Sequence, residues 1–137
     1  MLDEAKPFVK WAGGKRQLLD ELTKGLPSFS NYHEPFIGGG ALFFRLEAED
    51  EITKAYLGDS NEELINTYSV IKNEVFELMA ELASPVYANN ETAYYKIRAS
   101  KPASKVERAA RFVYLNKTAF NGLYRVNSKG GFNVPFG

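Results

Sequence analysis

Hydrophobic and polar positions in the first half of the chain predict two helices and two short strands. One helix follows Gly13-Gly14, presents leucines 18, 19, 22 and 26 on one face, and is ended by Gly25 and Pro27. A second apolar helix follows the glycines at 38–40 and reaches about residue 50. Extended runs precede these glycines and cover residues 55–59, so strands and helices alternate as in an α/β fold.

The second half is predicted to be mainly helical. Helical periodicity covers residues 62–72, an amphipathic segment at 75–82, residues 94–99 and a long helix that starts after Ser104. Ser60 with Glu63 and Ser104 with Glu107 have the spacing of capping boxes. We expect the buried side of the long helix to consist of Val106, Ala109, Ala110, Val113 and Leu115.

The last twenty residues change to alternating apolar and polar positions. Residues 123–127 and 132–136 flank Lys129-Gly130-Gly131, a pattern that predicts a β-ribbon with a basic turn. An exposed ribbon carrying Arg, Lys and Asn can enter a DNA groove, where Arg pairs with guanine and apolar side chains wedge between bases. The alternative is a plain hairpin packed on the core.

Composition narrows the class of protein. The 137 residues are 45% hydrophobic and 25% charged, which fits a soluble globular domain. No apolar run approaches the ~18 residues of a membrane span, and no signal-peptide pattern is present, so we expect a cytoplasmic protein. With no cysteine and His33 as the only histidine, we expect no metal site.

The net charge of zero conceals a segregation of charge along the chain. Residues 1–95 contain 8 Lys and Arg against 16 Asp and Glu, whereas residues 96–137 contain 9 Lys and Arg against Glu107 alone. A basic, aromatic-rich C-terminal third indicates a polyanionic partner. The alternative is a solvated face that pairs with acidic helices of the same protein.

Residues 34–40, Glu-Pro-Phe-Ile-Gly-Gly-Gly, form the segment around which the chain is organised. Three consecutive glycines at a strand-to-helix junction allow positive φ and close approach of a ligand to the backbone, beside the N–H groups of the next helix. A glycine turn that only lets helix and strand pack is the alternative. Asp59 follows Gly40 by 19 positions, near the spacing of ribose-binding acids, although it could also assist the next helix N-terminus.

The segment before the first helix has its own candidate residues. Gly13-Gly14-Lys15 is not a phosphate loop, because Val9 and Arg16 stand where that motif needs Gly and Ser or Thr. Lys15 and Arg16 occupy the predicted first turn, where the helix dipole disfavours cations, so a bound anion such as a carboxylate would suit them. Trp11 is either a core residue or a stacking wall.

Together these motifs resemble the Dam-type (D12 class) DNA adenine-N6 methyltransferases. The resemblance spans nearly the whole chain and rests on Lys10-Trp11-Ala12-Gly13-Gly14-Lys15, Glu34-Pro35-Phe36-Ile37-Gly38-Gly39-Gly40, Asp59-Ser60-Asn61, Asn121-Gly122-Leu123-Tyr124-Arg125 and Phe132-Asn133-Val134-Pro135-Phe136-Gly137.

The resemblance implies S-adenosylmethionine as the methyl donor and double-stranded DNA as the acceptor, with the target adenine flipped out. It implies a Rossmann-like cofactor domain over residues 1–75 and a mainly helical target-recognition region with the β-ribbon over 76–137. It also implies a bacterial or phage protein that works at the nucleoid. The matching positions for the cofactor are Trp11, Lys15, Phe36, Gly38, Gly40 and Asp59. The positions that match the DNA contacts of family members that recognise GATC are Lys10, Phe120, Asn121, Leu123 and Arg125, and Lys129 in the turn of the ribbon is expected to contact phosphate.

One family motif has no counterpart in this chain. None of the six prolines neighbours another, so the catalytic Asp-Pro-Pro-Tyr segment is absent and no catalytic residue is assigned. We expect an N-terminal portion of a longer methyltransferase, inactive alone and completed by the missing C-terminal portion. The alternatives are a noncatalytic DNA-binding or regulatory module that retains the cofactor pocket, and a generic nucleotide-binding domain.

Overall fold

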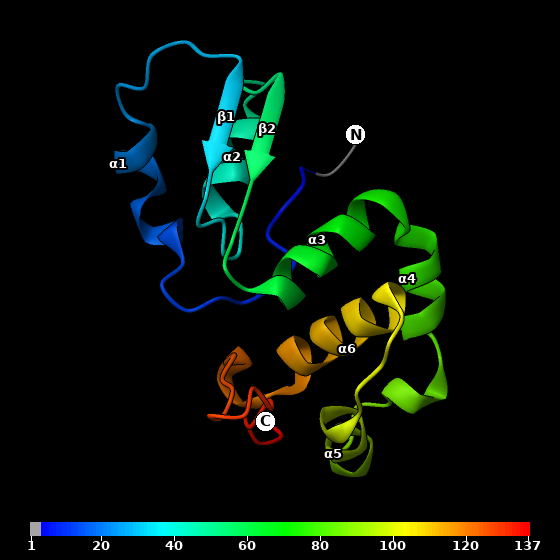
Figure 1. The fold of residues 1–137 in the computed structure, drawn as a ribbon. Coiled ribbons are helices and arrows are strands. Elements are labelled where there is room, and N and C mark those ends of the chain that lie inside the picture. Colours follow the sequence, from blue (N-terminus) through cyan, green and yellow to red (C-terminus); the bar gives the residue numbers. More distant parts are fainter. Residues whose placement is uncertain (1–3) are drawn as a thin grey trace. The chain divides into compact units, whose positions relative to one another are not determined.

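A computed structural model describes residues 4–137, and the chain divides into two compact units between Ser60 and Asn61 (Figure 1). The first unit contains a small parallel sheet with helices, and the second is mainly helical. This mixture confirms the predicted α/β class at the level of helices with a parallel sheet.

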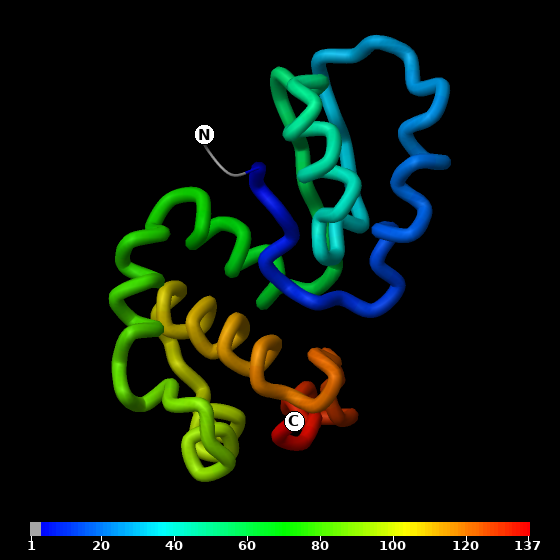
Figure 2. Tube along the Cα trace, turned by 180° about the vertical axis from the view of Figure 1, so that it is seen from behind, coloured from blue at the N-terminus to red at the C-terminus, as the bar shows by residue number. Residues whose placement is uncertain are grey.

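The first unit is built around a β-α-β arrangement. Strand β1 (Asn31–Glu34) pairs in parallel with β2 (Lys54–Leu57), and α2 (Ala41–Ala48) connects them. The strands lie in front of α2 in Figure 1, and α2 lies in front of the strands when seen from behind in Figure 2, so α2 covers one face of the sheet. Both predicted strands are confirmed, although β2 ends at Leu57 and the predicted run ends at residue 59.

The predicted N-terminal helix is shorter and less buried than its leucine pattern indicated. It consists of a 3₁₀ turn (Lys15–Leu18) followed by the five-residue α1 (Leu19–Thr23). Leu18, Leu22 and Leu26 are exposed, and Gly25 has a positive φ just beyond the helix. The predicted apolar face is therefore not a core face, since so short a helix does not present a continuous stripe.

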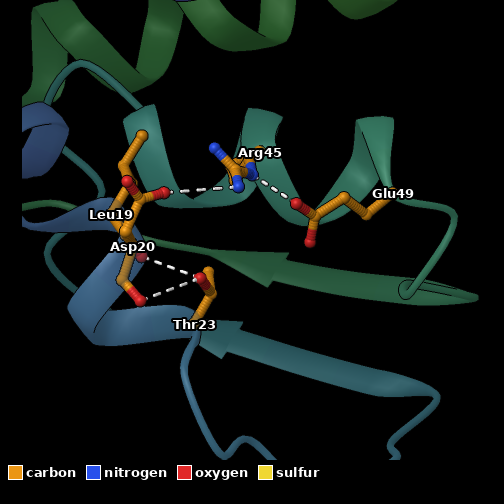
Figure 3. Close-up of polar contacts among 5 residues, drawn as sticks. All are labelled: Leu19, Asp20, Thr23, Arg45 and Glu49. Atoms are coloured by element: carbon orange, nitrogen blue, oxygen red, sulfur yellow. Dashed lines mark hydrogen bonds and ion pairs between the residues drawn. The ribbon is translucent and has the colours of Figure 1, made fainter.

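Polar side chains link α1 to α2 at the surface of the first unit. Figure 3 shows the Arg45 guanidinium between Glu49 on its own helix and Asp20 of α1, 3.4 Å from the Asp20 carboxylate. The Thr23 hydroxyl donates to the carbonyl of Leu19 at 2.8 Å, within α1. Because the Asp20 side chain is almost fully exposed, the ion pair across the two helices contributes little to stability.

The second unit is a helical unit centred on α6 (Lys105–Thr118). This helix packs against α3 (Glu62–Asn73), α4 (Val75–Leu82) and α5 (Glu91–Ala99). A 3₁₀ turn (Pro85–Tyr87) precedes α5. On α6 the buried residues are Ala109, Ala110, Phe112, Tyr114, Leu115 and Asn116, while the predicted core residues Val106 and Val113 are partly buried.

Two helix starts test the predicted capping boxes. At α6 the prediction is confirmed, because the Ser104 hydroxyl accepts from the Glu107 N–H at 3.1 Å and donates to its carboxylate at 3.0 Å. At α3 it is wrong, since the cap is Asn61, whose Oδ1 accepts from the Leu64 N–H at 3.0 Å. Asn and Ser cap about equally well, so the one adjacent to the first helical residue takes the position.

The C-terminal segment is held against α5 by buried polar contacts. The Tyr94 hydroxyl and an Arg98 N–H both donate to the Val134 carbonyl, at 2.7 and 3.1 Å. Arg111 of α6 donates to the carbonyls of Ile97 and Arg98, and burial lowers the pKa of its guanidinium. The Arg98 carbonyl at the end of α5 thereby gains a partner, and the Ile97 carbonyl, which also accepts from the Ser100 N–H and hydroxyl, gains a further one.

Candidate cofactor site and DNA-binding segment

The glycine loop and the segment after β2 meet at one edge of the sheet. Because β1 and β2 are parallel, the segments that follow the two strands leave the sheet at the same edge. The Gly58 N–H donates to the Glu34 carbonyl at 2.8 Å, and the Ile37 N–H donates to the Gly58 carbonyl at 2.9 Å. These backbone bonds fix the loop at residues 36–40 beside Asp59.

Asp59 contacts the glycine loop directly. Its Oδ2 accepts a hydrogen bond from the Gly38 N–H at 3.0 Å. Gly38 and Gly40 both have positive φ, and Gly40 is the N-cap residue of α2. The carboxylate predicted to bind ribose thus also orients the loop.

Trp11 packs against the same loop. A Cβ added to Gly38 would lie 2.8 Å from Trp11 Cδ1, and one added to Gly39 would lie 3.4 Å from Trp11 Cβ. Trp11 is half-buried, so it packs along one side of the loop and is not a fully enclosed core residue. Gly38 is therefore required here both by the close approach of the indole and by its positive φ, whereas the contact at Gly39 is of ordinary van der Waals length.

Lys15 is paired with an acid that the sequence prediction did not include among the site residues. Its Nζ lies 3.2 Å from Glu34 Oε1 and donates to the Phe36 carbonyl at 3.2 Å. Glu34 is buried, and its Oε2 accepts from the Tyr32 hydroxyl at 2.7 Å. The sequence signal that could have identified Glu34 is its place at the end of a predicted strand. A carboxylate that is buried at such a position requires a charged or hydrogen-bonding partner.

Phe36 completes the group of predicted cofactor residues. Its side chain is 75% exposed beside the loop, and it is available as an apolar wall for a ligand. The structure therefore brings together all six of the predicted cofactor residues: Trp11, Lys15, Phe36, Gly38, Gly40 and Asp59.

The predicted β-ribbon forms only an irregular hairpin. Its ladder is reduced to isolated antiparallel bridges, between Val126 and Phe132 and between Ala119 and Phe136. The predicted strands at 123–127 and 132–136 are therefore wrong. The carbonyls of the second predicted strand bond elsewhere, since those of Asn133 and Val134 accept from the Arg125 and Tyr94 side chains and that of residue 135 accepts from the Phe120 N–H. Asn127 Oδ1 accepts from the N–H groups of Lys129 and Gly131, each at 2.9 Å, and so shapes the turn.

The predicted DNA-contacting residues of the second unit lie on this segment. Phe120 and Leu123 are exposed, and Asn121 has a positive φ in a 3₁₀ turn (Phe120–Gly122). Arg125 donates from Nε to Asn133 Oδ1 at 2.7 Å and from Nη2 to the Asn133 carbonyl at 3.1 Å. Lys129 is exposed in the turn, whereas Lys10 is an exposed residue of the first unit.

Part of the positive charge of the C-terminal third is used internally. Arg108 pairs with Glu63 of α3 at 2.6 Å, which raises the pKa of Arg108 through the hydrogen bond and the charge of Glu63. Arg98 and Arg111 donate to backbone carbonyls. Within residues 4–137 no cluster of three or more His, Asp or Glu is placed to hold a metal ion, and no helix has the length and apolarity to cross a membrane.

The family model for D12 class N6 adenine-specific DNA methyltransferases matches residues 11–137. The chain belongs to this family. The match includes both the glycine loop and the irregular hairpin, so the D12 class relationship extends over both compact units.

Similar proteins include type II methyltransferases and DNA adenine methylases. The chain is 43% identical to the type II methyltransferase M.MjaIII of Methanocaldococcus jannaschii, over 98% of this chain and 53% of the relative. It is 43% identical to the DNA adenine methylase of Haemophilus influenzae, over 96% of this chain and 47% of that protein. It is 38% identical to the DNA adenine methylase of Escherichia coli K12, over 96% of this chain and 48% of that protein. The chain thus spans about half the length of these curated relatives.

Proposed function

We propose that this chain supplies the cofactor-binding and DNA-binding parts of a site-specific DNA adenine-N6 methyltransferase. Residues 1–75 would bind S-adenosylmethionine and residues 76–137 would recognise double-stranded DNA in the bacterial or phage-infected cytoplasm. The observation that carries the proposal is the convergence on the Gly38 loop of two segments, one with Trp11 and Lys15 and the other with Asp59.

The chemistry of these residues matches the parts of S-adenosylmethionine. The cofactor, when bound, supplies the methyl group from its sulfonium. It contains a carboxylate, an ammonium, a ribose and an adenine but no phosphate. Asp59 would accept hydrogen bonds from the ribose hydroxyls, Phe36 and Trp11 would form apolar walls, and the Lys15 ammonium would bind the carboxylate.

The irregular hairpin would provide the contacts to DNA. Its exposed Phe120 and Leu123 are suited to wedge against bases, and Asn121 can hydrogen-bond a base edge. Arg125 would read a guanine in the major groove, with GATC as the candidate site, while Lys129 would contact phosphate. Lys10 would add a base contact from the first unit.

A second candidate is a noncatalytic DNA-binding or regulatory module that retains the cofactor pocket. It would use the same group of residues around the Gly38 loop and the same exposed side chains of the hairpin, Phe120 and Leu123. The two candidates share the cofactor and DNA contacts and differ only in methyl transfer. A downstream segment that restored transfer would decide for the methyltransferase.

Calorimetric titration with S-adenosylmethionine tests the cofactor site. We expect Asp59→Asn to weaken binding by about tenfold or more, the loss expected for a charge-assisted hydrogen bond. Asn retains an oxygen that can accept from Gly38, so the variant isolates the role of the carboxylate. Asp20→Asn, at the exposed end of an ion pair with Arg45, is the matched control and should bind like the unchanged chain. Equal affinity for all three proteins would remove Asp59 from the site.

A further inference from the structure

Glu34 occupies a position where an apolar side chain would fit the sheet more simply. Tyr32 and Glu34 alternate with His33 along β1 and so share one face of the strand, and Glu34 is only 6% exposed. A buried carboxylate is costly unless its oxygens are paired. Both oxygens of Glu34 are engaged, one by Lys15 and the other by Tyr32.

The Lys15 ammonium is directed toward the glycine loop by two acceptors. Glu34 Oε1 and the Phe36 carbonyl each lie 3.2 Å from Nζ, and Phe36 belongs to the loop itself. An ammonium has three N–H donors. Since the Lys15 side chain remains 38% exposed, the third donor can reach the carboxylate of a ligand.

Tyr32 in turn fixes the orientation of Glu34. Its ring stacks on Phe43 of α2, with centroids 6.5 Å apart, and lies 6.2 Å from the Phe29 ring. Its hydroxyl is 2.7 Å from Glu34 Oε2. The Tyr32 hydroxyl is protonated at neutral pH and donates this bond, and burial together with the bond to Glu34 raises its pKa further.

We infer that Glu34 and Tyr32 are positioning residues that hold the Lys15 ammonium in place for the amino-acid end of the cofactor. The inference rests on the proposed cofactor site. Without Glu34, the flexible Lys15 side chain would lose one of its two fixed acceptors, and the ligand would have to order it. The consequence is a selective effect, because only ligands with an amino-acid carboxylate use Lys15.

Two ligands that lack the sulfonium charge separate this role from a general effect on the pocket. S-adenosylhomocysteine and 5′-methylthioadenosine share the adenosine and the thioether, but only the first carries the amino-acid group. Calorimetry on the whole chain should show that Glu34→Gln weakens S-adenosylhomocysteine by ~10-fold, the size of one lost charge-assisted hydrogen bond, and leaves 5′-methylthioadenosine unchanged. Tyr32→Phe should give a smaller loss with the same selectivity, and Glu47→Gln, on the exposed surface of α2, should change neither.

A double variant tests whether the effect passes through Lys15. In a Lys15→Met background, Glu34→Gln should cause no further loss of S-adenosylhomocysteine affinity. Additive losses, or an equal weakening of both ligands by Glu34→Gln, would overturn the inference while leaving the cofactor site in place. If Glu34→Gln does not fold, Tyr32→Phe tests the inference in the same way, by whether it weakens S-adenosylhomocysteine but not 5′-methylthioadenosine. If the unchanged chain binds neither ligand, the proposed function fails and the inference fails with it.

Discussion

The Gly38 N–H donates a hydrogen bond to the Asp59 carboxylate at 3.0 Å, and this bond joins the two segments that follow β1 and β2. The residues are 21 positions apart, yet the parallel pairing of the strands delivers both to one edge of the sheet. If Asp59 binds the cofactor as proposed, the geometry of the loop and the binding of the ligand depend on the same acid. Changes in the glycine loop should therefore affect both.

Gly38→Ala should destabilise the first unit more than the same change at a glycine of similar backbone conformation. At Gly38 the new methyl group would meet the Trp11 ring in addition to adopting a positive φ. We expect the crowding to add ~1–3 kcal/mol to the ~1–2 kcal/mol of backbone strain. Urea unfolding followed by Trp11 fluorescence measures the difference.

The matched control is Gly25→Ala. Gly25 has a φ of +76°, and a methyl group added there would have no atom within 4 Å apart from those of Gly25 and its two chain neighbours, so only strain is introduced. If both variants have the same unfolding midpoint, the contact between Trp11 and the loop carries no energetic weight.

Tyr94 should make the stability of the second unit fall at high pH. Burial raises its pKa to about 12, from 10.0 in the unfolded chain. The unfolded state therefore loses the Tyr94 proton first, so the stabilisation from this hydroxyl is complete below pH 10 and is lost between about pH 10 and 12. Urea unfolding monitored by circular dichroism should show Tyr94→Phe to be less stable by ~0.5–1.5 kcal/mol at neutral pH, with a smaller deficit above about pH 10.

Tyr95→Phe provides the control for Tyr94. Tyr95 is the next residue on α5 and is exposed, so its substitution should leave the unfolding free energy nearly unchanged. A deficit in Tyr94→Phe that stays constant from about pH 7 to about pH 12 would show that the hydroxyl does not titrate as described.

Arg125 and Lys129 should have separable effects on DNA binding. A base contact by Arg125 is worth ~1–3 kcal/mol of discrimination, so Arg125→Ala should relax preference at one base pair. Lys129→Ala should weaken all duplexes alike and reduce the salt slope by about one. Fluorescence anisotropy with matched and singly substituted duplexes at several salt concentrations distinguishes the two effects. If Arg125→Ala lowered the affinity for all duplexes equally, the hairpin would contact DNA only through charge and Arg125 would not read a base.

The 137-residue chain alone should not transfer a methyl group to DNA. The family's Asp-Pro-Pro-Tyr segment, which holds the target amino group, has no counterpart in it. Tritium transfer from labelled S-adenosylmethionine to duplex DNA should appear only when the part of a full-length relative outside the matched region is added. Transfer by the unaided chain would contradict the assignment of no catalytic residue.

The helices were predictable because their signals are local. Ser104 and Glu107 lie within one turn, and their capping contacts are confirmed. The strand at 132–136 was not, because alternation does not reveal that the Val134 carbonyl accepts from the Tyr94 and Arg98 side chains instead of from a partner strand. The prediction of a core face around α1 was wrong for a similar reason. The spacing of leucines does not indicate whether another element covers the face of the helix that they form.

The candidate site was predictable residue by residue but not contact by contact. The glycines and the spacing of Asp59 indicated a ligand edge from the sequence alone. The pair between Lys15 and Glu34 joins residues 19 positions apart and depends on how β1 lies beside the 3₁₀ turn. The sequence predicted a bound anion beside Lys15, and the structure shows that the protein's own Glu34 carboxylate lies there.

Chemical-shift mapping tests the central claim, the cofactor site at the strand ends of the first unit, most directly. Trp11 is the only tryptophan, so its indole N–H gives a single resonance in a ¹H–¹⁵N spectrum of the whole chain. Addition of S-adenosylhomocysteine should shift this resonance together with the backbone amides of Gly38, Gly40 and Asp59, and Asp59→Asn should weaken the response. Absence of shifts at saturating ligand, or shifts confined to residues 61–137, would contradict the account.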